Sequence, residues 1–169
     1  MAKPSNNGLT GLSAGLLASL LLLAGFILLS KLFQRKNSQS YAAMRNQIQT
    51  GLESRGIHPS VAKILTAVSA LETGFWTSNL MKKANNLWGM KNPTTRSSTS
   101  TGPTSSGFAT YNDIDGALDD IRLYLTYFRY PEQATLTEFA QTMKNKGYFT
   151  EELSGYLPAL QSTYKELYG

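Results

Sequence analysis

One carboxylate in this 169-residue sequence falls on an apolar helical stripe. The stripe consists of Val61, Ile64, Leu65 and Val68, which recur at helical spacing. One helical turn further on, the same series reaches Glu72. Such a carboxylate either pairs with a buried cation or keeps its proton, because an ionised group is costly where water is scarce. A proton kept near neutral pH suits a general acid, so the position leaves a structural ion pair and a catalytic acid both open.

Other catalytic chemistries find little support in the sequence. His58 is the only histidine, and it lies beside Pro59 at an expected helix start, where a capping or surface role is typical. The absence of cysteine excludes disulfides and thiolate metal sites. No nucleophile-elbow motif, metal-ligand cluster or glycine-rich phosphate loop occurs. We therefore expect no metal and no cofactor.

Apolar periodicity predicts a mostly helical domain from Tyr41 to the end of the chain. The helical stretches are expected near residues 41–52, 58–74, 112–128, 135–147 and 150–167. Residues 135–138, Thr-Leu-Thr-Glu, resemble a capping box, and Gly74 can close the helix that carries Glu72. Pro158 should kink or divide the last helix.

Two short aromatic segments, residues 86–91 and 108–111, are bounded by turn formers and could pair as a small hairpin. Residues 94–107 lie between them and are rich in Ser, Thr, Gly and Pro. Such a composition is typical of a mobile loop.

Four short segments follow one another in an order that is typical of one enzyme family. They are residues 67–74 (Ala-Val-Ser-Ala-Leu-Glu-Thr-Gly), 85–91 (Asn-Asn-Leu-Trp-Gly-Met-Lys), 108–111 (Phe-Ala-Thr-Tyr) and 147–150 (Gly-Tyr-Phe-Thr). They resemble the helix end Glu-Ser/Thr-Gly, the Asn-Asn-Leu-Phe-Gly-Ile-Lys segment, the Phe-Arg-x-Tyr strand and the Gly-Tyr-Ala-Thr segment of the glucosaminidase family of peptidoglycan hydrolases. The resemblance covers about residues 45–168. It implies a mainly α, lysozyme-like domain with a small β-hairpin lobe.

The resemblance also implies roles for single residues. Glu72 would be the general acid that protonates the glycosidic oxygen, and Tyr148 would face the scissile bond and position a water or the acetamido group of the sugar. Asn86, Trp88 and Tyr111 would line the sugar groove, since such grooves mix aromatic and amide side chains. For Trp88 and Tyr111, ordinary core packing is the alternative.

The segment after Glu72 departs from the family in two ways. Phe75 and Trp76 stand where the family usually has Trp-Gly, so Trp76 is a further candidate for sugar contact in an altered turn. The family also carries a second carboxylate in its hairpin lobe, whereas residues 73–112 here contain no Asp or Glu. The first acids beyond are Asp113 and Asp115, at an expected helix N-terminus where Asp113 would also serve as a cap.

Three mechanisms are therefore open. Asp113 or Asp115 could act as the base that glycosidases usually pair with their acid. The acetamido oxygen of the substrate could attack the anomeric carbon instead. Glu72 could also act alone, first as acid and then as base toward the 6-hydroxyl of the sugar, as in lytic transglycosylases.

The function that these features predict is cleavage of the β-1,4 glycosidic bonds of peptidoglycan glycan strands, of the N-acetylglucosaminidase type, for cell-wall opening. A lytic transglycosylase or a muramidase, acting in phage lysis or entry, is one alternative. A wall-binding module that keeps the groove without catalysis is another.

The N-terminal region predicts a membrane anchor. Residues 9–30 carry no charge and consist mainly of Leu, Ala, Gly, Phe and Ile. About 20 apolar residues span a hydrocarbon core of roughly 30 Å. The apolar region of a signal peptide is shorter, about 7–15 residues. We expect a polar N-terminus over residues 1–8, a transmembrane helix over 9–33 that contacts the lipid bilayer, a linker over 34–40, and the enzyme domain over 41–169.

Charge is concentrated beside this anchor. The first 36 residues hold four basic side chains and no acidic ones, whereas the remainder holds 12 basic against 11 acidic side chains. The basic pI therefore gives little support for nucleic-acid binding, which needs a basic patch on the folded domain.

The flanking charges also bear on topology. Lys31, Arg35 and Lys36 follow the predicted helix and only Lys3 precedes it, which favours a cytoplasmic C-terminal domain, where no peptidoglycan exists. A phage lysis protein, or an enzyme in the membrane of a lipid-containing virion, would resolve the conflict. We expect a single-pass membrane protein of the cell envelope or of such a virion. The sequence gives no indication of oligomeric state.

Overall fold

The computed structural model describes residues 41–169. The predicted N-terminus, transmembrane helix and linker, residues 1–8, 9–33 and 34–40, lie outside the described residues. Within the described part of the chain, no helix combines the length and apolar character needed to cross a membrane.

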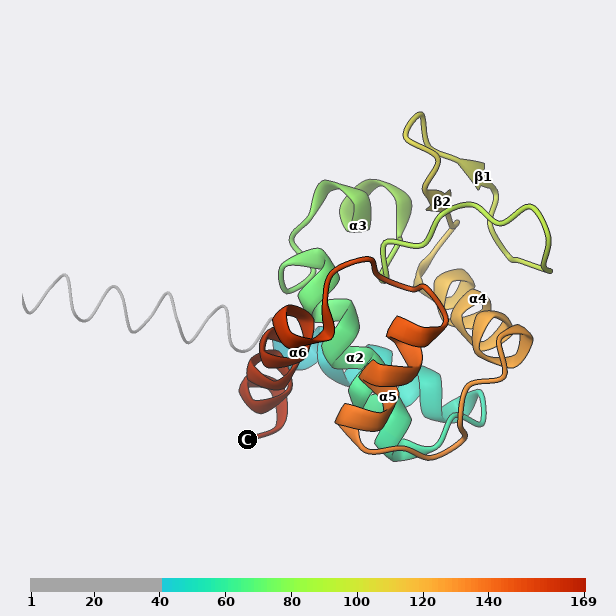
Figure 1. Ribbon diagram of the computed structural model, residues 1–169. Coiled ribbons are helices and arrows are strands. Elements are labelled where there is room, and N and C mark those ends of the chain that lie inside the picture. Colours follow the sequence, from blue (N-terminus) through green and yellow to red (C-terminus); the bar gives the residue numbers. More distant parts are fainter. Residues whose placement is uncertain (1–40) are drawn as a thin grey trace, which may run out of the picture. The chain divides into compact units, whose positions relative to one another are not determined.

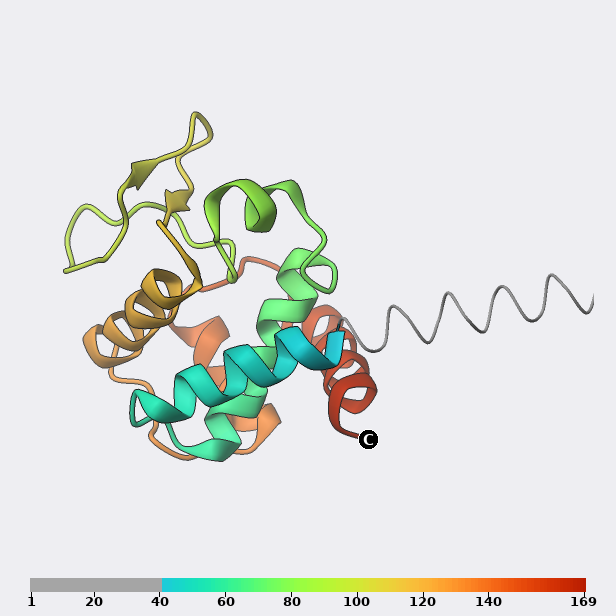
Figure 2. The ribbon, with the colours of Figure 1, turned by 180° about the vertical axis from the view of Figure 1, so that it is seen from behind.

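A central helix, α2 (Pro59–Thr73), organises the domain. Pro59 occupies its first turn, where a missing N–H costs nothing, and the His58 side chain accepts a hydrogen bond from the Ser60 N–H at 3.3 Å. Gly74 closes the helix in the left-handed conformation with φ 56°, as predicted. Most of the side chains of α2 are buried, and the helix packs against α6 (Leu153–Tyr168) and α5 (Leu136–Asn145). A helix over residues 41–54 crosses α2 on the face that Figure 2 shows in front.

Two further helices begin at residues whose side chains cap them. Asp113 caps α4 (Ile114–Tyr127) by accepting the Gly116 N–H at 2.8 Å. Thr135 and Glu138 form the predicted capping box at the start of α5. Pro158 lies inside α6, which runs from Leu153 to Tyr168, so the prediction that it divides this helix is wrong.

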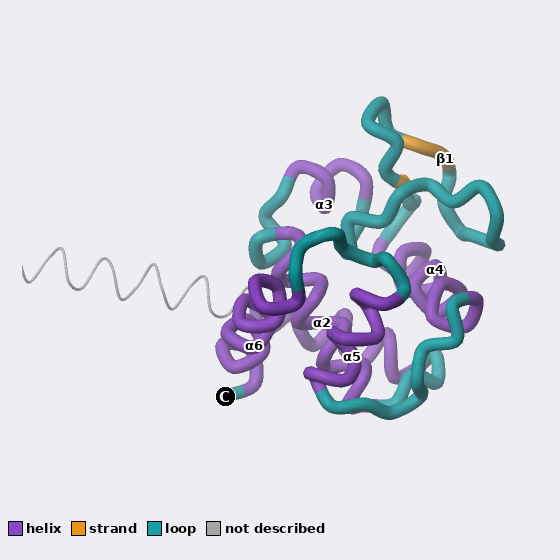
Figure 3. Tube along the Cα trace, viewed as in Figure 1, coloured by secondary structure: helices purple, strands orange, loops and turns teal. Residues whose placement is uncertain are grey.

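A small lobe stands above the helices, made of the short helix α3 (Asn79–Ala84) and two strands (Figure 1). Strand β1 (Gly102–Pro103) pairs antiparallel with β2 (Ala109–Thr110), Gly102 opposite Thr110. The predicted pairing of residues 86–91 with 108–111 is confirmed at one bridge, between Lys91 and Phe108. Long loops make up most of this lobe (Figure 3).

A buried ion pair fastens this lobe to α4. Both oxygens of Asp120, whose side chain is 0% exposed, accept hydrogen bonds from the Arg96 guanidinium at 2.8 Å. The Tyr111 hydroxyl donates to the same carboxylate at 2.8 Å, and the Thr99 hydroxyl donates to the Gly116 carbonyl at 2.6 Å. Burial alone would raise the pKa of Asp120, but hydrogen bonds, led by those of Arg96, hold the pKa below its usual value. The loop over residues 94–107 is therefore anchored at its root, which the composition did not predict.

Replacement of Asp120 by Ala should be strongly destabilising. The variant leaves the Arg96 guanidinium buried without its counter-charge, which costs about 3–5 kcal/mol. Urea denaturation would measure the change in the free energy of unfolding. The matched control is Asp119→Ala on the same helix, whose exposed pair with Arg55 should contribute less than about 1 kcal/mol. Equal losses in the two variants would contradict the anchoring role.

Candidate active site

Glu72 lies in the last turn of α2, one residue before the helix ends at Thr73. The buried stripe ends one turn earlier at Val68, and Glu72 itself is exposed. The periodicity predicted a buried position for Glu72, and this prediction is wrong because the Glu72 side chain leaves the core in the last turn of the helix. Among residues 41–169 no cation forms a salt bridge with Glu72, so the structural ion pair left open by the sequence is not formed there.

Tyr156 is the hydrogen-bond partner of Glu72. Its hydroxyl donates to Glu72 Oε1 at 3.1 Å, across 84 residues of sequence. Burial by neighbouring protein raises the pKa of the Glu72 carboxyl, and the hydrogen bond from Tyr156 opposes part of that rise. The result is a carboxyl that keeps its proton to a higher pH than a free glutamate does, while the residue still reaches solvent.

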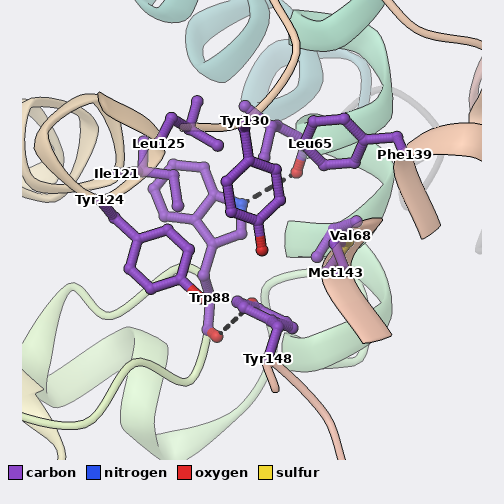
Figure 4. Close-up of a pocket in the computed structure, with 10 residues that line it drawn as sticks. All are labelled: Leu65, Val68, Trp88, Ile121, Tyr124, Leu125, Tyr130, Phe139, Met143 and Tyr148. Carbon is purple, nitrogen blue, oxygen red and sulfur yellow. Dashed lines mark hydrogen bonds between the residues drawn. The ribbon is translucent and has the colours of Figure 1, made fainter. Parts of the chain in front are cut away.

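The carboxyl is framed by two further chain segments. The Tyr148 hydroxyl donates to the Trp88 carbonyl at 2.7 Å (Figure 4). The next residue, Gly89, has φ 61°, and a Cβ placed there would lie 3.7 Å from Glu72 Oε2. Phe149 stacks on the Tyr156 ring at 3.9 Å between centroids. Residues 88–89 thus lie on the Oε2 side of the carboxyl, and Tyr156 lies on the Oε1 side.

Tyr148, the second predicted catalytic residue, belongs to this frame. Burial raises the pKa of its phenol well above the usual value, and the negative charge of Glu72 adds to the rise. Tyr148 is therefore a neutral hydroxyl at physiological pH. It can donate or accept a hydrogen bond but does not supply a second negative charge.

The predicted sugar-contacting residues Asn86 and Trp88 lie in the core. Asn86 is fully buried and donates through Nδ2 to the carbonyls of Met90 and Ala109 at 2.9 and 2.8 Å. Trp88 is 2% exposed, and its Nε1 donates to the Leu65 carbonyl at 2.9 Å. The Trp88 bond fixes the turn that carries Gly89 to helix α2, and the Asn86 bonds brace the same turn against β2. These contacts favour a supporting role over direct contact with a sugar.

Trp76 and Tyr111 are buried as well. Trp76 Nε1 donates to Ser69 Oγ at 2.7 Å, and the Tyr111 hydroxyl donates to Asp120. Phe75 and Trp76 both adopt positive φ, at 52° and 62°. The altered turn after Glu72 therefore folds the Trp76 ring back onto the core.

The two candidates for a second catalytic carboxylate form other interactions. Asp113 caps α4 through its Oδ1, as the alternative reading of the sequence anticipated. Asp115 forms a salt bridge with Arg55 at 2.9 Å. Neither forms a hydrogen bond with a residue of the frame around Glu72 in the described region. The structure thus brings together Glu72 and Tyr148, adds Tyr156, and places the other candidates in supporting positions.

Sequence reasoning missed Tyr156 as a site residue. It was visible only as one member of the apolar face of the last helix, together with Leu153, Leu157 and Leu160. A tyrosine on such a face buries its ring but needs a partner for its hydroxyl, and that partner could have been sought.

A helical domain with one solvent-reaching carboxyl of raised pKa, hydrogen-bonded by a tyrosine rather than paired with a cation, has features of a glycoside-cleaving enzyme. The sequence matches the glucosaminidase family, described as mannosyl-glycoprotein endo-β-N-acetylglucosaminidase, over residues 45–168. The chain belongs to this family and is a glycosidase. No curated protein matches the chain.

Solved structures with the same fold include three bacterial proteins. A chain of a type VI secretion system effector–immunity complex from Pseudomonas protegens gives a TM-score of 0.59 at 14% identity, covering 78% of this chain and 93% of that one. The catalytic domain of the autolysin Auto from Listeria monocytogenes gives 0.53 at 17% identity, covering 78% and 84%. The glycoside hydrolase domain of FlgJ from Salmonella typhimurium gives 0.52 at 21% identity, covering 77% and 87%. At these identities the likeness shows the fold.

Tyr156→Phe should shift the pH dependence of the reaction. The hydrogen bond from Tyr156 lowers the pKa of Glu72, so its loss raises that pKa further. A general acid works in its protonated form, so the alkaline limb of the pH profile of kcat/KM should move to higher pH, with a lower maximum because the carboxyl is less well oriented. The control, Tyr164→Phe on the same helix, should leave the profile in place. An alkaline limb that stays put or moves to lower pH in Tyr156→Phe would contradict this role.

Proposed function

We propose that the protein cleaves β-1,4 glycosidic bonds in the glycan strands of peptidoglycan, as an endo-β-N-acetylglucosaminidase with Glu72 as general acid. The observation that carries the proposal is the Glu72 carboxyl itself, which reaches solvent, has its pKa raised by burial and has a tyrosine rather than a cation as its hydrogen-bond partner. Membership of the glucosaminidase family supports the choice of bond.

The fold neighbours support the choice of polymer. One of them is the catalytic domain of an autolysin, and another is a glycoside hydrolase domain. A third is a chain of a type VI secretion system effector–immunity complex. A glycan of the bacterial cell wall is a substrate that is consistent with all three of these fold neighbours.

In the first step, Glu72 donates its proton to the glycosidic oxygen. The bond between that oxygen and the anomeric carbon breaks, and positive charge develops on the sugar ring. Because Tyr156 occupies Oε1, the proton to be donated is the one on Oε2. Gly89 stands on that side of the carboxyl, and the carbonyl of the preceding residue, Trp88, accepts a hydrogen bond from Tyr148.

In the second step a nucleophile has to form a bond to the anomeric carbon. With Asp113 and Asp115 engaged at α4, the arrangement favours a route without a second enzyme carboxylate. In the proposed route the acetamido oxygen of the substrate attacks the anomeric carbon. Glu72, now ionised, then removes a proton from the water that opens the cyclic intermediate. The competing route uses the 6-hydroxyl of the sugar as nucleophile and consumes no water.

Glu72→Gln should abolish cleavage. The amide is close in shape to the acid but has no proton to donate, so wall-clearing activity should fall by about 10²–10⁴-fold. Turbidity loss of purified peptidoglycan measures the change. Asp115→Asn, a matched carboxylate-to-amide change outside the frame, should retain activity. Absence of clearing by the unmodified protein, together with retained wall binding, would identify a binding module instead.

The products should distinguish the bond and the route. We expect mass spectrometry of digested peptidoglycan to show fragments with N-acetylglucosamine at the reducing end. Fragments ending in 1,6-anhydro-muramic acid would identify a lytic transglycosylase. Fragments with reducing muramic acid ends would identify a muramidase.

A further inference from the structure

Three aromatic residues at the C-terminal end of α4 form a continuous surface, which we call the α4 aromatic strip: Tyr124, Tyr127 and Phe128. The Tyr124 and Phe128 rings lie 4.6 Å apart between centroids, and the Tyr127 and Phe128 rings 4.9 Å apart. Tyr127 is 52% exposed and is the one exposed large hydrophobic side chain among residues 41–169. Tyr124 and Phe128 are half-buried.

Packing of the domain does not account for the outer end of the strip. The face of α4 that meets the core carries Ala117, Leu118 and Ile121, all buried. Tyr127 lies beyond these residues and leaves about half of its surface in water, which forfeits the gain from burying an aromatic ring. An exposed ring that packs on a second aromatic ring, which in turn packs on a third, is a feature of surfaces that bind partners, whereas a single exposed apolar residue is common.

The strip is continuous with the frame around Glu72. The Tyr124 ring meets the Tyr148 ring edge to face at 6.1 Å. Both rings line a small apolar cavity of about 10 Å³ beside Trp88, with Tyr124 on the α4 side and Tyr148 opposite (Figure 4). The Tyr148 hydroxyl in turn contacts the Trp88 carbonyl next to Gly89. A series of contacts through Tyr148 and Trp88 therefore links the strip to the Gly89 segment beside the proposed catalytic carboxyl.

The inner end of the strip is held in place from above. The Arg96 guanidinium lies over the Tyr124 ring at 5.4 Å and is itself fixed by Asp120, one turn earlier on α4. The strip thus lies on the side of α4 to which the upper lobe is fastened. A polymer that passes Glu72 between the lobe and the helices would continue along these rings.

The chemistry of the strip fits a carbohydrate. Pyranose rings present flat C–H faces that pack on aromatic rings, and the hydroxyl of Tyr127 can bond a sugar hydroxyl. Tyrosine rings supply contact area at low conformational cost because only two side-chain torsions are fixed on binding.

We propose that the α4 aromatic strip is a sugar-binding platform that holds the glycan strand at a distance from the bond cleaved beside Glu72, so that strands of several disaccharides bind better than single disaccharides. The inference rests on the proposed function.

The test measures binding in the Glu72→Gln background, where the strand is not consumed. The probes are peptide-free glycan strands of several disaccharides and the single disaccharide, both prepared from peptidoglycan. Adding Tyr127→Ala should weaken binding of the long strands by about three- to tenfold, the range expected for losing one ring contact. Binding of the single disaccharide should not change. Tyr127→Phe, which keeps the ring, should bind the long strands almost as well as the parent.

Thr126→Ala is the matched surface control, because Thr126 is the exposed neighbour that lines a separate cleft with Arg122 and Arg129. It should leave both affinities unchanged, and thermal unfolding should show that all variants are folded. Equal binding of long strands by the Tyr127→Ala and parent proteins would overturn the platform and leave the proposed function standing. Failure of the Glu72→Gln parent to bind either probe would overturn both.

Discussion

The hydrogen bond between Tyr156 and Glu72 joins the end of the central helix to the C-terminal helix at the point where chemistry is expected. Helix α2 is buried along most of its length, so it cannot shift without disturbing the core. Glu72 takes its position from that rigidity and its protonation from the protein around it. Tyr156 then occupies one of its two oxygens, which leaves the other as the proton donor. The proposed reaction needs this difference between the two oxygens: Oε1 accepts the hydrogen bond from Tyr156, and Oε2 carries the proton that is donated.

A second set of contacts places the upper lobe relative to this carboxyl. Asn86 and Trp88 bind backbone carbonyls below and behind the turn that carries Gly89, and Arg96 with Asp120 fastens the following loop to α4. The polar groups of these residues point into the protein and are satisfied there. Their effect on a substrate would be exerted through the position of the backbone that faces Glu72.

Local rules predicted the helices well because their signals are local. The Thr135–Glu138 capping box and the glycine that closes α2 depend on residues within one turn of each other. The resemblance of four short segments also predicted the family and the position of Glu72. Neither the local rules nor the resemblance distinguishes a groove-lining side chain from a buried one. Trp88 and Tyr111 would look the same in the sequence whether they lined a groove or packed in the core. Tyr156 and Asp120 escaped notice because their partners lie 84 and 24 residues away, where no spacing rule applies.

Because residues 73–112 contain no acidic side chain, the sequence of the outer loop of the upper lobe can change without loss of a catalytic carboxylate. The attachment of this lobe to the helices uses the Arg96 guanidinium, the hydroxyls of Thr99 and Tyr111 and the indole N–H of Trp88. The tip of the hairpin around residues 103–106 lies beyond these attachments, so it is relieved both of fastening the lobe to the helices and of supplying a catalytic base. Substitutions there would alter which chemical decorations of a polymer fit under the lobe while the acid below keeps its place.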